Sequence, residues 1–498
     1  MDMHWLTKLL ASIQREKKQQ IARKQPEAPP LSLEYIQQAF QNIHDAKTIE
    51  INNEFLGNIA LFYIRSLVDV RQLQEFVIFP LQHSSHTSLR ETVSAVEVNE
   101  LNTVEEAEQA VLKGSVILHA ENRLWSIILP NSVSRAIETS EQESIIYGPK
   151  DSFSEQIDQN LTLIRRRLPI RALKSEELTV GSLSKTTVIL LYIDGLTNPE
   201  LIGIAREKTS VIEYDTFLDT SHLAHFLEDH ICSVFPQFQQ TDRPDAVVAA
   251  LTSGKVVWLV DNTPFALIGP ITFFDLFQSP EDYIHRWVVA SFLRGLRFFA
   301  FLFAMVLTPI YVALTMHHYQ MMPIELLYVL LESRSQIPFN PFWEALFMLL
   351  TLEILKEASL RMPSKSGHTL GVVGGIVIGQ AAVAAKIASN ILIIHVAVMA
   401  IASFLIPNYL MTNSSKLIQF GLLILAAWLG MWGITLGLIL VLIHLHGLTS
   451  LKQPFISPLV PFYATDWKDT IVRLPSRWMI QRPAYLKPLK RYKFSKRK

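Results

Sequence analysis

Ionisable side chains inside an apolar segment are the residues of this chain whose spacing could do chemistry. Residues 341–360 read PFWEALFMLLTLEILKEASL and carry Glu344, Glu353, Lys356 and Glu357. On a helix, the last three share one face and can pair with each other. Charges are costly in lipid, so we expect these side chains to face protein or water, and they are candidates for an ion pathway or a coupling role. A helix lying at the membrane interface, with a solvated charged face, is the alternative interpretation.

A second regular spacing is that of three glycines in a later apolar segment. Gly371, Gly375 and Gly379 recur every four residues in LGVVGGIVIGQAAVAAK. Such a stripe lets another helix approach closely, so packing between helices is favoured over direct lining of a pore. Lys386 ends the same segment and is a further candidate for a coupling role. Pro309 lies in the middle of an earlier apolar segment and is predicted to kink it.

Residues typical of catalytic and metal sites do not occur in recognisable patterns. The pairs His317/His318 and His444/His446 have no cysteine or carboxylate at metal-ligand spacing and are expected at helix ends. Gly254-Lys255 lacks the rest of a phosphate-binding loop, so a turn is predicted. No GxSxG, HExxH or dinucleotide fingerprint is present. The sequence therefore predicts no enzyme activity, no cofactor and no metal.

The elements that must position these residues are apolar stretches in the last 200 residues. Residues 298–316 contain no charge in 19 positions, enough for a helix to cross a bilayer core of about 30 Å. Stretches 370–388, 391–411 and 417–445 have the same character. We therefore predict a polytopic helical bundle, a membrane domain of four to five helices over 286–447, with four full crossings as the simplest arrangement.

The first 285 residues have the pattern of a mixed α/β protein. An apolar strand that turns into a helix occurs at 59–70 and again at 187–196, about 129 residues later. This predicts two related α/β subdomains, 51–150 and 151–285, after a polar and basic N-terminal helix and linker at 1–50. Within the second, we predict a helix at 244–251 and a hairpin of strands 256–260 and 264–268.

Charge is distributed unevenly along the chain. Residues 1–297 carry 38 acidic and 27 basic side chains, whereas 466–498 carry 11 basic and 2 acidic ones. The basic tail, 448–498, and the arginines before the first span, Arg286, Arg294 and Arg297, predict that both the N-terminal region and the tail are cytoplasmic. Attraction of the tail to anionic membrane lipid is favoured over binding to nucleic acid.

Two further features indicate the compartment. The first 20 residues contain only a short amphipathic patch and no cleavage site of small residues, unlike a secretory signal. Cys232 is the sole cysteine, so an internal disulfide is excluded, and we expect a buried, inert thiol in a reducing compartment.

Longer blocks of sequence resemble a known family. These blocks are YGPKDSFSEQIDQNLTLIRRRL, TDRPDAVVAALTSGKVVWLVDNTPFALIGPITFFDLFQSPEDY, IPFNPFWEALFMLLTLEILKEASLRMP and GVVGGIVIGQAAVAAKIAS. In this order, over roughly 145–412, they resemble the GerA family of spore germination proteins, in particular the A subunits of nutrient germinant receptors. Two positions depart from the family pattern. SKSGHTLG lacks a hydrophobic residue before its first glycine, and Lys386 stands where the family favours glycine, adding a positive charge near the inner end of a helix.

The resemblance implies a multi-pass protein of the inner membrane of a bacterial endospore. It implies a permease-like B subunit and a lipoprotein C subunit as partners, and a homo-oligomer whose helices form an ion channel. Germinant sensed by the partner would then open the path for ions. A SpoVAF-type accessory protein of dipicolinate release is the nearest alternative. A solute transporter is less favoured because the unequal spans show no pair of repeated halves.

Overall fold

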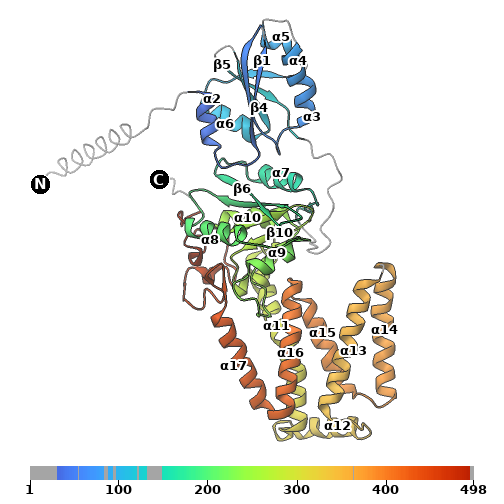
Figure 1. The fold of residues 1–498 in the computed structure, drawn as a ribbon. Helices are drawn as coiled ribbons and strands as arrows, with labels where there is room; N and C mark the ends of the chain where they lie inside the picture. Colours follow the sequence, from blue (N-terminus) through green and yellow to red (C-terminus); the bar gives the residue numbers. More distant parts are fainter. Residues whose placement is uncertain are drawn as a thin grey trace, which may run out of the picture. The chain divides into compact units, whose positions relative to one another are not determined.

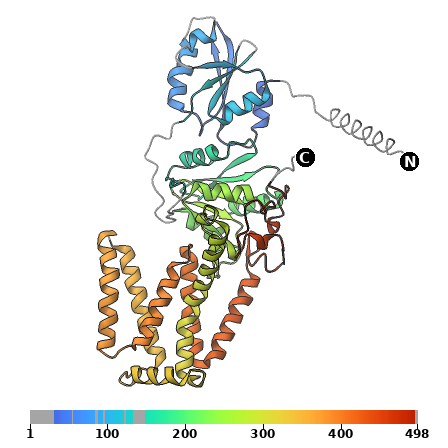
Figure 2. The same cartoon turned by 180° about the vertical axis from the view of Figure 1, so that it is seen from behind.

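The computed structural model describes residues 31–53, 55–83, 88–93, 97–120, 123–131, 148–362 and 364–493, without the side chains of 364–373. The chain divides into two compact units, Met1–Ala136 with Asp158–Glu176, and Ile137–Ile157 with Glu177–Lys498. An α/β region comes first and a helical region follows it (Figures 1 and 2). The predicted N-terminal helix falls outside the described residues.

The first unit contains a five-stranded sheet in the order β1-β2-β4-β5-β3, with antiparallel neighbours. Its strands are β1 (Ala46–Asn53), β2 (Gly57–Ile64), β3 (Val98–Glu100), β4 (Ser115–Ala120) and β5 (Arg123–Ile128). Its helices are α2 (Leu33–Ala39), α3 (Val70–Leu73), the π-helix η1 (Gln74–Ile78), α4 (Phe79–His83), α5 (Leu89–Thr92), α6 (Val104–Leu112) and α7 (Ile157–Arg167). Helix α2 and the start of β1 lie inside the stretch expected to be a linker.

Helices cover both faces of this sheet, as the alternation along β2 shows. Ile59 and Leu61 enter one apolar core with residues of α3 and α4. Phe62 and Ile64 enter a second core, where Phe40 after α2 and residues of α6 are also buried. A strand that is apolar on both sides reads as one continuous apolar run, which is why this segment was recognisable in the sequence.

The second unit contains another five-stranded sheet with the equivalent order, β6-β7-β9-β10-β8. Its strands are β6 (Leu173–Val180), β7 (Thr186–Ile193), β8 (Gln239–Thr241), β9 (Val256–Val260) and β10 (Ala266–Gly269), accompanied by α8 (Pro199–Ser210), α9 (Thr220–Leu227) and α10 (Pro244–Ser253). The two strands that carried the repeated pattern, β2 and β7, both occupy the second position of their sheets.

The predicted helix and hairpin of this sheet are confirmed. Helix α10 ends at Gly254, whose φ of 100° is left-handed and suits glycine at a helix end. Strand β9 then pairs antiparallel with β10, which begins at Ala266, two residues later than predicted. Gly254-Lys255 therefore forms a turn, as expected, and not a phosphate loop.

The helical region begins directly after two short 3-10 helices, η2 (Phe273–Phe277) and η3 (Pro280–Tyr283). It comprises α11 (Trp287–Met316), the 3-10 helix η4 (Tyr319–Met321), α12 (Ile324–Arg334), α13 (Pro341–Arg361), α14 (Ser364–Ala384), α15 (Asn390–Phe404), α16 (Tyr409–Leu429) and α17 (Met431–Gly447). Helix α11 continues through Pro309, which is buried inside it.

Two of the predicted stretches have different ends in the structure. Helix α15 stops at Phe404, and Asn408 caps α16 by accepting a hydrogen bond from the Met411 amide at 3.0 Å. The stretch 417–445 is not one helix, because Gly430 has a φ of 62° and separates α16 from α17. A Cβ at Gly430 would lie 2.6 Å from His318 Nε2, so the turn itself requires glycine.

Among the described residues, two helices are long and apolar enough to cross a membrane, namely α11 and α16. The apolar helices α15, α17 and the segment Gly374–Ala384 of α14 are shorter.

The second sheet, β6-β7-β9-β10-β8, together with the helices packed on it and η2 and η3, is called the second sheet unit below. The chain after α17 folds back onto this second sheet unit instead of forming a free tail. This C-terminal segment, 449–493, contains β11 (Thr449–Ser450), β12 (Gln453–Pro454), η5 (Asp466–Lys468) and η6 (Ala484–Leu486). Leu489 donates its amide to the Leu196 carbonyl at 2.9 Å, and Arg482 Nε donates to the Thr252 carbonyl at 2.8 Å.

Candidate functional site

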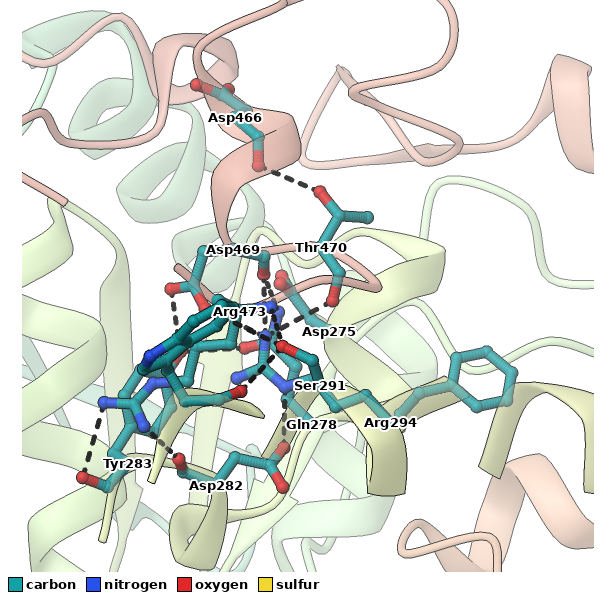
Figure 3. A network of polar contacts seen from close by, with 12 residues as sticks. Asp275, Gln278, Asp282, Tyr283, Ser291, Arg294, Asp466, Asp469, Thr470 and Arg473 are labelled. Carbon is teal, nitrogen blue, oxygen red and sulfur yellow. Dashed lines mark hydrogen bonds and ion pairs between the residues drawn. The ribbon is translucent and has the colours of Figure 1, made fainter. Parts of the chain in front are cut away.

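A network of ion pairs and hydrogen bonds lies where the helical region begins, and we call it the clamp: Asp282, Arg294, Arg297, Asp469 and Arg473. Figure 3 shows four of its members, Asp282, Arg294, Asp469 and Arg473. Arg294 Nε lies 2.7 Å from Asp282 Oδ2, and its Nη1 lies 2.8 Å from Asp469 Oδ1. Arg297 Nη1 lies 2.8 Å from Asp282 Oδ1. Arg473 Nη1 donates to the Asp282 backbone carbonyl at 2.5 Å.

These residues come from three segments that are distant in sequence. Asp282 belongs to η3 at the end of the second sheet unit, Arg294 to the start of α11, and Arg473 to the C-terminal segment. On α11, Ser291 strengthens the connection, because its hydroxyl donates to the Arg473 carbonyl and accepts from the Arg473 amide, both at 3.0 Å. The clamp therefore fixes how the first helix leaves the sheet unit.

Three members of the clamp are buried, whereas the side chain of Asp469 is 33% exposed. Asp282 is 0% exposed, Arg294 2% and Arg473 4%. Arg294 and Arg297 share the Asp282 carboxylate, and Arg294 also pairs with Asp469. The guanidinium of Arg473 instead donates to backbone carbonyls, and the ring of Tyr283 lies 5.4 Å from Arg294 and 5.1 Å from Arg473. Among the described residues, Arg294 Nη2 and Arg473 Nε have no hydrogen-bond partner. Removing one member would leave an uncompensated buried charge, so these segments are expected to move together.

A second set of polar contacts attaches the C-terminal segment beside the clamp. Lys255 Nζ lies 2.7 Å from Asp275 Oδ2, which also accepts a hydrogen bond from the Tyr485 hydroxyl at 3.3 Å. Asp466 Oδ2 accepts from the Ala484 amide at 2.7 Å, although burial raises the pKa of this carboxyl above its ordinary value. Lys255, Asp275, Asp466 and Tyr485 line a pocket of about 370 Å³.

Sequence reasoning identified Arg294 and Arg297 as cytoplasmic charges and missed their ion pairs. Arg294 lies 12 residues from Asp282 and 175 from Asp469, so no short motif joins the three. One local feature could have indicated these ion pairs. The two arginines have i, i+3 spacing and follow the acidic segment PEDY, so their side chains share the helix face nearest to it.

The predicted pore candidates do not meet in one site. Glu344, at the start of α13, is 0% exposed and accepts a hydrogen bond from the Ser389 amide at 2.6 Å. Its Oε2 lies 3.5 Å from Arg334 Nη1 and has no hydrogen-bond partner among the described residues. Tyr311 joins this cluster through a 3.1 Å contact between its hydroxyl and that of Ser389.

The charges near the other end of α13 have separate partners. Glu353 Oε2 lies 2.6 Å from Lys416 Nζ on α16. Lys356 lies over the ring of Phe404, 4.6 Å from its centroid. Glu357 is exposed and pairs with Arg361 on its own helix at 2.6 Å. Glu353 thus links two helices, whereas the ion pair of Glu357 among the described residues stays within α13.

Lys386 lies in the turn after α14 and is exposed. Its φ of 57° is left-handed, a conformation that favours glycine. The turn precedes Ser389, which contacts Glu344 at the start of α13, away from the clamp. Lys386 thus lies just beyond the end of α14, and its location at the inner end of that helix stays a prediction.

Gly375 and Gly379 of α14 face open space more than a neighbour. A Cβ at Gly375 would lie 3.9 Å from Leu355 on α13, and one at Gly379 would have no atom within 4 Å. Gly374, outside the predicted stripe, is the closer contact, with Leu355 Cδ1 3.0 Å away. The side-chain surroundings of Gly371 lie outside the description of this helix.

The histidine pairs lie at helix ends. His317 Nε2 contacts the Ala427 carbonyl at 2.8 Å, and His444 Nε2 contacts the Ser233 hydroxyl at 3.1 Å. In the part of the chain that the structure describes, no group of three or more His, Cys, Asp or Glu side chains could hold a metal ion. Cys232 is exposed, so the expectation of a buried thiol is wrong.

Within the second unit, the clamp fixes a sheet with its helices to a group of apolar helices. Residues 34–485 match the model of the Bacillus/Clostridium GerA spore germination protein. The chain therefore belongs to the GerA family.

Named relatives align over most of their length. The chain is 40% identical over 472 residues to the spore germination protein GerQA of Bacillus cereus, covering 93% of this chain and 94% of the relative. It is 34% identical to the spore germination protein A1 of Bacillus subtilis, covering 85% and 90%. A crystal structure of the N-terminal domain of the A subunit of the Bacillus megaterium spore germinant receptor GerK3 matches 48% of this chain and 94% of that chain, at 24% identity and a TM-score of 0.37.

Proposed function

We propose that this protein is the A subunit of a nutrient germinant receptor in the inner membrane of the spore. Family membership over residues 34–485 and the identity to GerQA support the germination role. The observation that carries the coupling role is the clamp, because it joins the second sheet unit to the first helix and to the segment that follows the last helix. A movement of the sheet unit would then reach both ends of the helical region.

The contacts of the C-terminal segment support an even number of membrane crossings. Helix α11 leaves the second sheet unit, and the chain after α17 returns to the same unit, where Asp469 pairs with Arg294 and the Arg473 amide donates to Ser291 of α11. Both ends of the helical region therefore lie on one side of any membrane that it spans. The basic residues of the C-terminal segment make the cytoplasmic side, the spore core, the side we propose.

The proposed complex contains a permease-like B subunit, a lipoprotein C subunit and further copies of this chain. The open face of α14 at Gly375 and Gly379 supports contact with a neighbouring copy, since small residues allow close approach of helices. We propose that germinant is sensed by the partners and that the helices of this chain open an ion pathway in response.

Deletion of the gene followed by complementation tests this function. Spores without the protein should lose potassium and dipicolinate release in response to at least one nutrient in a panel of amino acids, sugars and nucleosides. They should still respond to the other nutrients of the panel. A uniform slowing of dipicolinate release under every stimulus would contradict the receptor role and favour the SpoVAF-type alternative.

Two complementing variants test whether the helices carry the signal. Glu353→Gln removes the charge that links α13 to Lys416 on α16 and should change the rate of potassium release. Glu357→Gln, four residues further on, removes an exposed charge that pairs within its own helix and should leave the rate unchanged. Equal rates in both variants, at equal protein levels, would contradict a role for the α13–α16 link.

A further inference from the structure

The loop between α9 and β8, residues 228–236, exposes apolar side chains where a soluble domain would bury them. Ile231 is 81% exposed and Val234 41%, with the exposed Cys232 between them. We call this segment the 228–236 loop. Large exposed apolar side chains that are close together commonly mark an interaction surface.

On both sides of the tip formed by Ile231 and Cys232, backbone groups of this loop are hydrogen-bonded within the α/β region. Gln237 Oε1 accepts from the amides of Asp229 and His230, at 2.8 and 3.0 Å, and its Nε2 donates to the His230 carbonyl at 2.7 Å. The Ser233 amide also donates to the His230 carbonyl, at 3.2 Å. A loop held in this way can approach an apolar environment without leaving these groups unpaired.

The loop also contacts the ends of two apolar helices. The Ser414 hydroxyl, in the second turn of α16, donates to the Val234 carbonyl. Ser233 contacts His444 near the end of α17 at 3.1 Å, and the ring of Phe235 stacks on that of His444 with centroids 6.1 Å apart. The exposed tips of the loop therefore lie at the level where these two helices begin and end.

Exposed apolar residues continue from this level along both helices. Leu417 on α16 is 62% exposed, and Leu440 on α17 is 61% exposed. A bilayer around these helices would have its surface close to the loop. Lipid could bury the apolar surface of Ile231 and Val234, because the hydrophobic effect is non-directional and needs no specifically shaped partner.

We propose that the 228–236 loop inserts Ile231 and Val234 into the surface of the bilayer, with membrane lipid as the occupant of this apolar face. This inference rests on the proposed function, which places α16 and α17 in a membrane. The second sheet unit would then be held against the membrane at two places, by the clamp and by this loop.

The natural sequence supplies the probe, because Cys232 is its sole cysteine and is exposed. A nitroxide attached to Cys232 of the full chain, in nanodiscs of phosphatidylethanolamine and phosphatidylglycerol, reports collision with membrane-dissolved oxygen and with a water-soluble nickel complex. Two control positions are made in a Cys232→Ser background. Leu440→Cys represents a lipid-facing position, and Leu218→Cys represents an exposed apolar residue of the same α/β region, 81% exposed.

The expected result is an oxygen-to-nickel accessibility ratio at Cys232 that exceeds that at Leu218→Cys and approaches that at Leu440→Cys. A ratio equal to that of Leu218→Cys, while Leu440→Cys remains in lipid, would overturn the inference and leave the proposed function intact. An aqueous ratio at Leu440→Cys would overturn both.

A second variant tests the apolar side chain itself. Ile231→Asp, in the chain labelled at Cys232, should lower the oxygen-to-nickel ratio toward the value at Leu218→Cys, whereas Leu218→Asp should leave it unchanged. Spin–spin broadening between Cys232 labels of neighbouring copies would instead place the loop in a contact between protein chains and overturn the proposal.

Discussion

At the scale of single residues, buried charges determine which segments stay together. Arg294 makes ion pairs with both Asp282 and Asp469, and each of the three belongs to a different segment. Burying such a network costs desolvation free energy, so the network contributes little net stability when it is complete. Its specificity comes from the large cost of leaving one charge unpaired.

Arg294→Met should therefore destabilise the helical region relative to the second sheet unit, by about 3–5 kcal/mol, since it leaves Asp282 buried next to fewer positive charges. Thermal unfolding of the full chain in detergent measures the effect. Arg286→Met is the matched control, because Arg286 is exposed just before the same helix. Similar melting temperatures for the two variants would contradict the clamp.

A second buried pair predicts how the first unit responds to pH. Burial opposes ionisation of Asp45, but Arg165 at 2.7 Å, His44 and the Ser66 hydroxyl hold the pKa of Asp45 below its ordinary value of 3.8. Because the pKa is lowered in the folded state, the stabilisation is complete above pH 3.8 and is lost as the pH falls through the lowered pKa.

Asp45→Asn should thus weaken the first sheet by about 3–5 kcal/mol at neutral pH and have progressively less effect below pH 3.8. Hydrogen exchange of peptides from β1 and β2 in the full chain measures the difference. A difference between variant and natural protein that is independent of pH would show that the charge of Asp45 is not responsible.

At the scale of elements, turn residues decide where apolar stretches break. From hydropathy alone, 391–411 and 417–445 were each predicted to be a single span, and both predictions were wrong. The first stretch is interrupted before Asn408, which caps α16, and the second is broken by the left-handed turn at Gly430. Hydropathy contains no information on caps or turns. The strands and the helix of the second sheet were predictable, since Gly254 and an apolar run of five residues are local signals. The clamp was not predictable, because its partners are up to 191 residues apart.

Gly430→Ala tests the turn between α16 and α17. Its φ of 62° and the approach of His318 leave no room for a Cβ, so the substitution should cost at least about 1–2 kcal/mol. Gly421→Ala, within α16 and with no atom within 4 Å of the added Cβ, should be neutral or slightly stabilising. Detergent melting curves compare the two, and equal stability would mean that the turn tolerates side chains.

At the scale of the whole molecule, contacts give the helices alternating directions. The start of α13 meets Ser389 before α15, whereas its later turns meet Phe404 at the end of α15 and Lys416 at the start of α16. The end of α11 meets Ala427 at the end of α16. Met321, in η4, is therefore expected at the end of the helical region far from the clamp.

Labelling of single cysteines with a membrane-impermeant maleimide, in a Cys232→Ser background, tests the central claim most directly. In intact protoplasts of the producing cell, Met321→Cys should react, while Leu183→Cys in the β6–β7 turn and Lys490→Cys in the C-terminal segment should react only after lysis. Reaction of Lys490→Cys from outside, with Leu183→Cys still protected, would separate the two ends of the helical region and contradict the account.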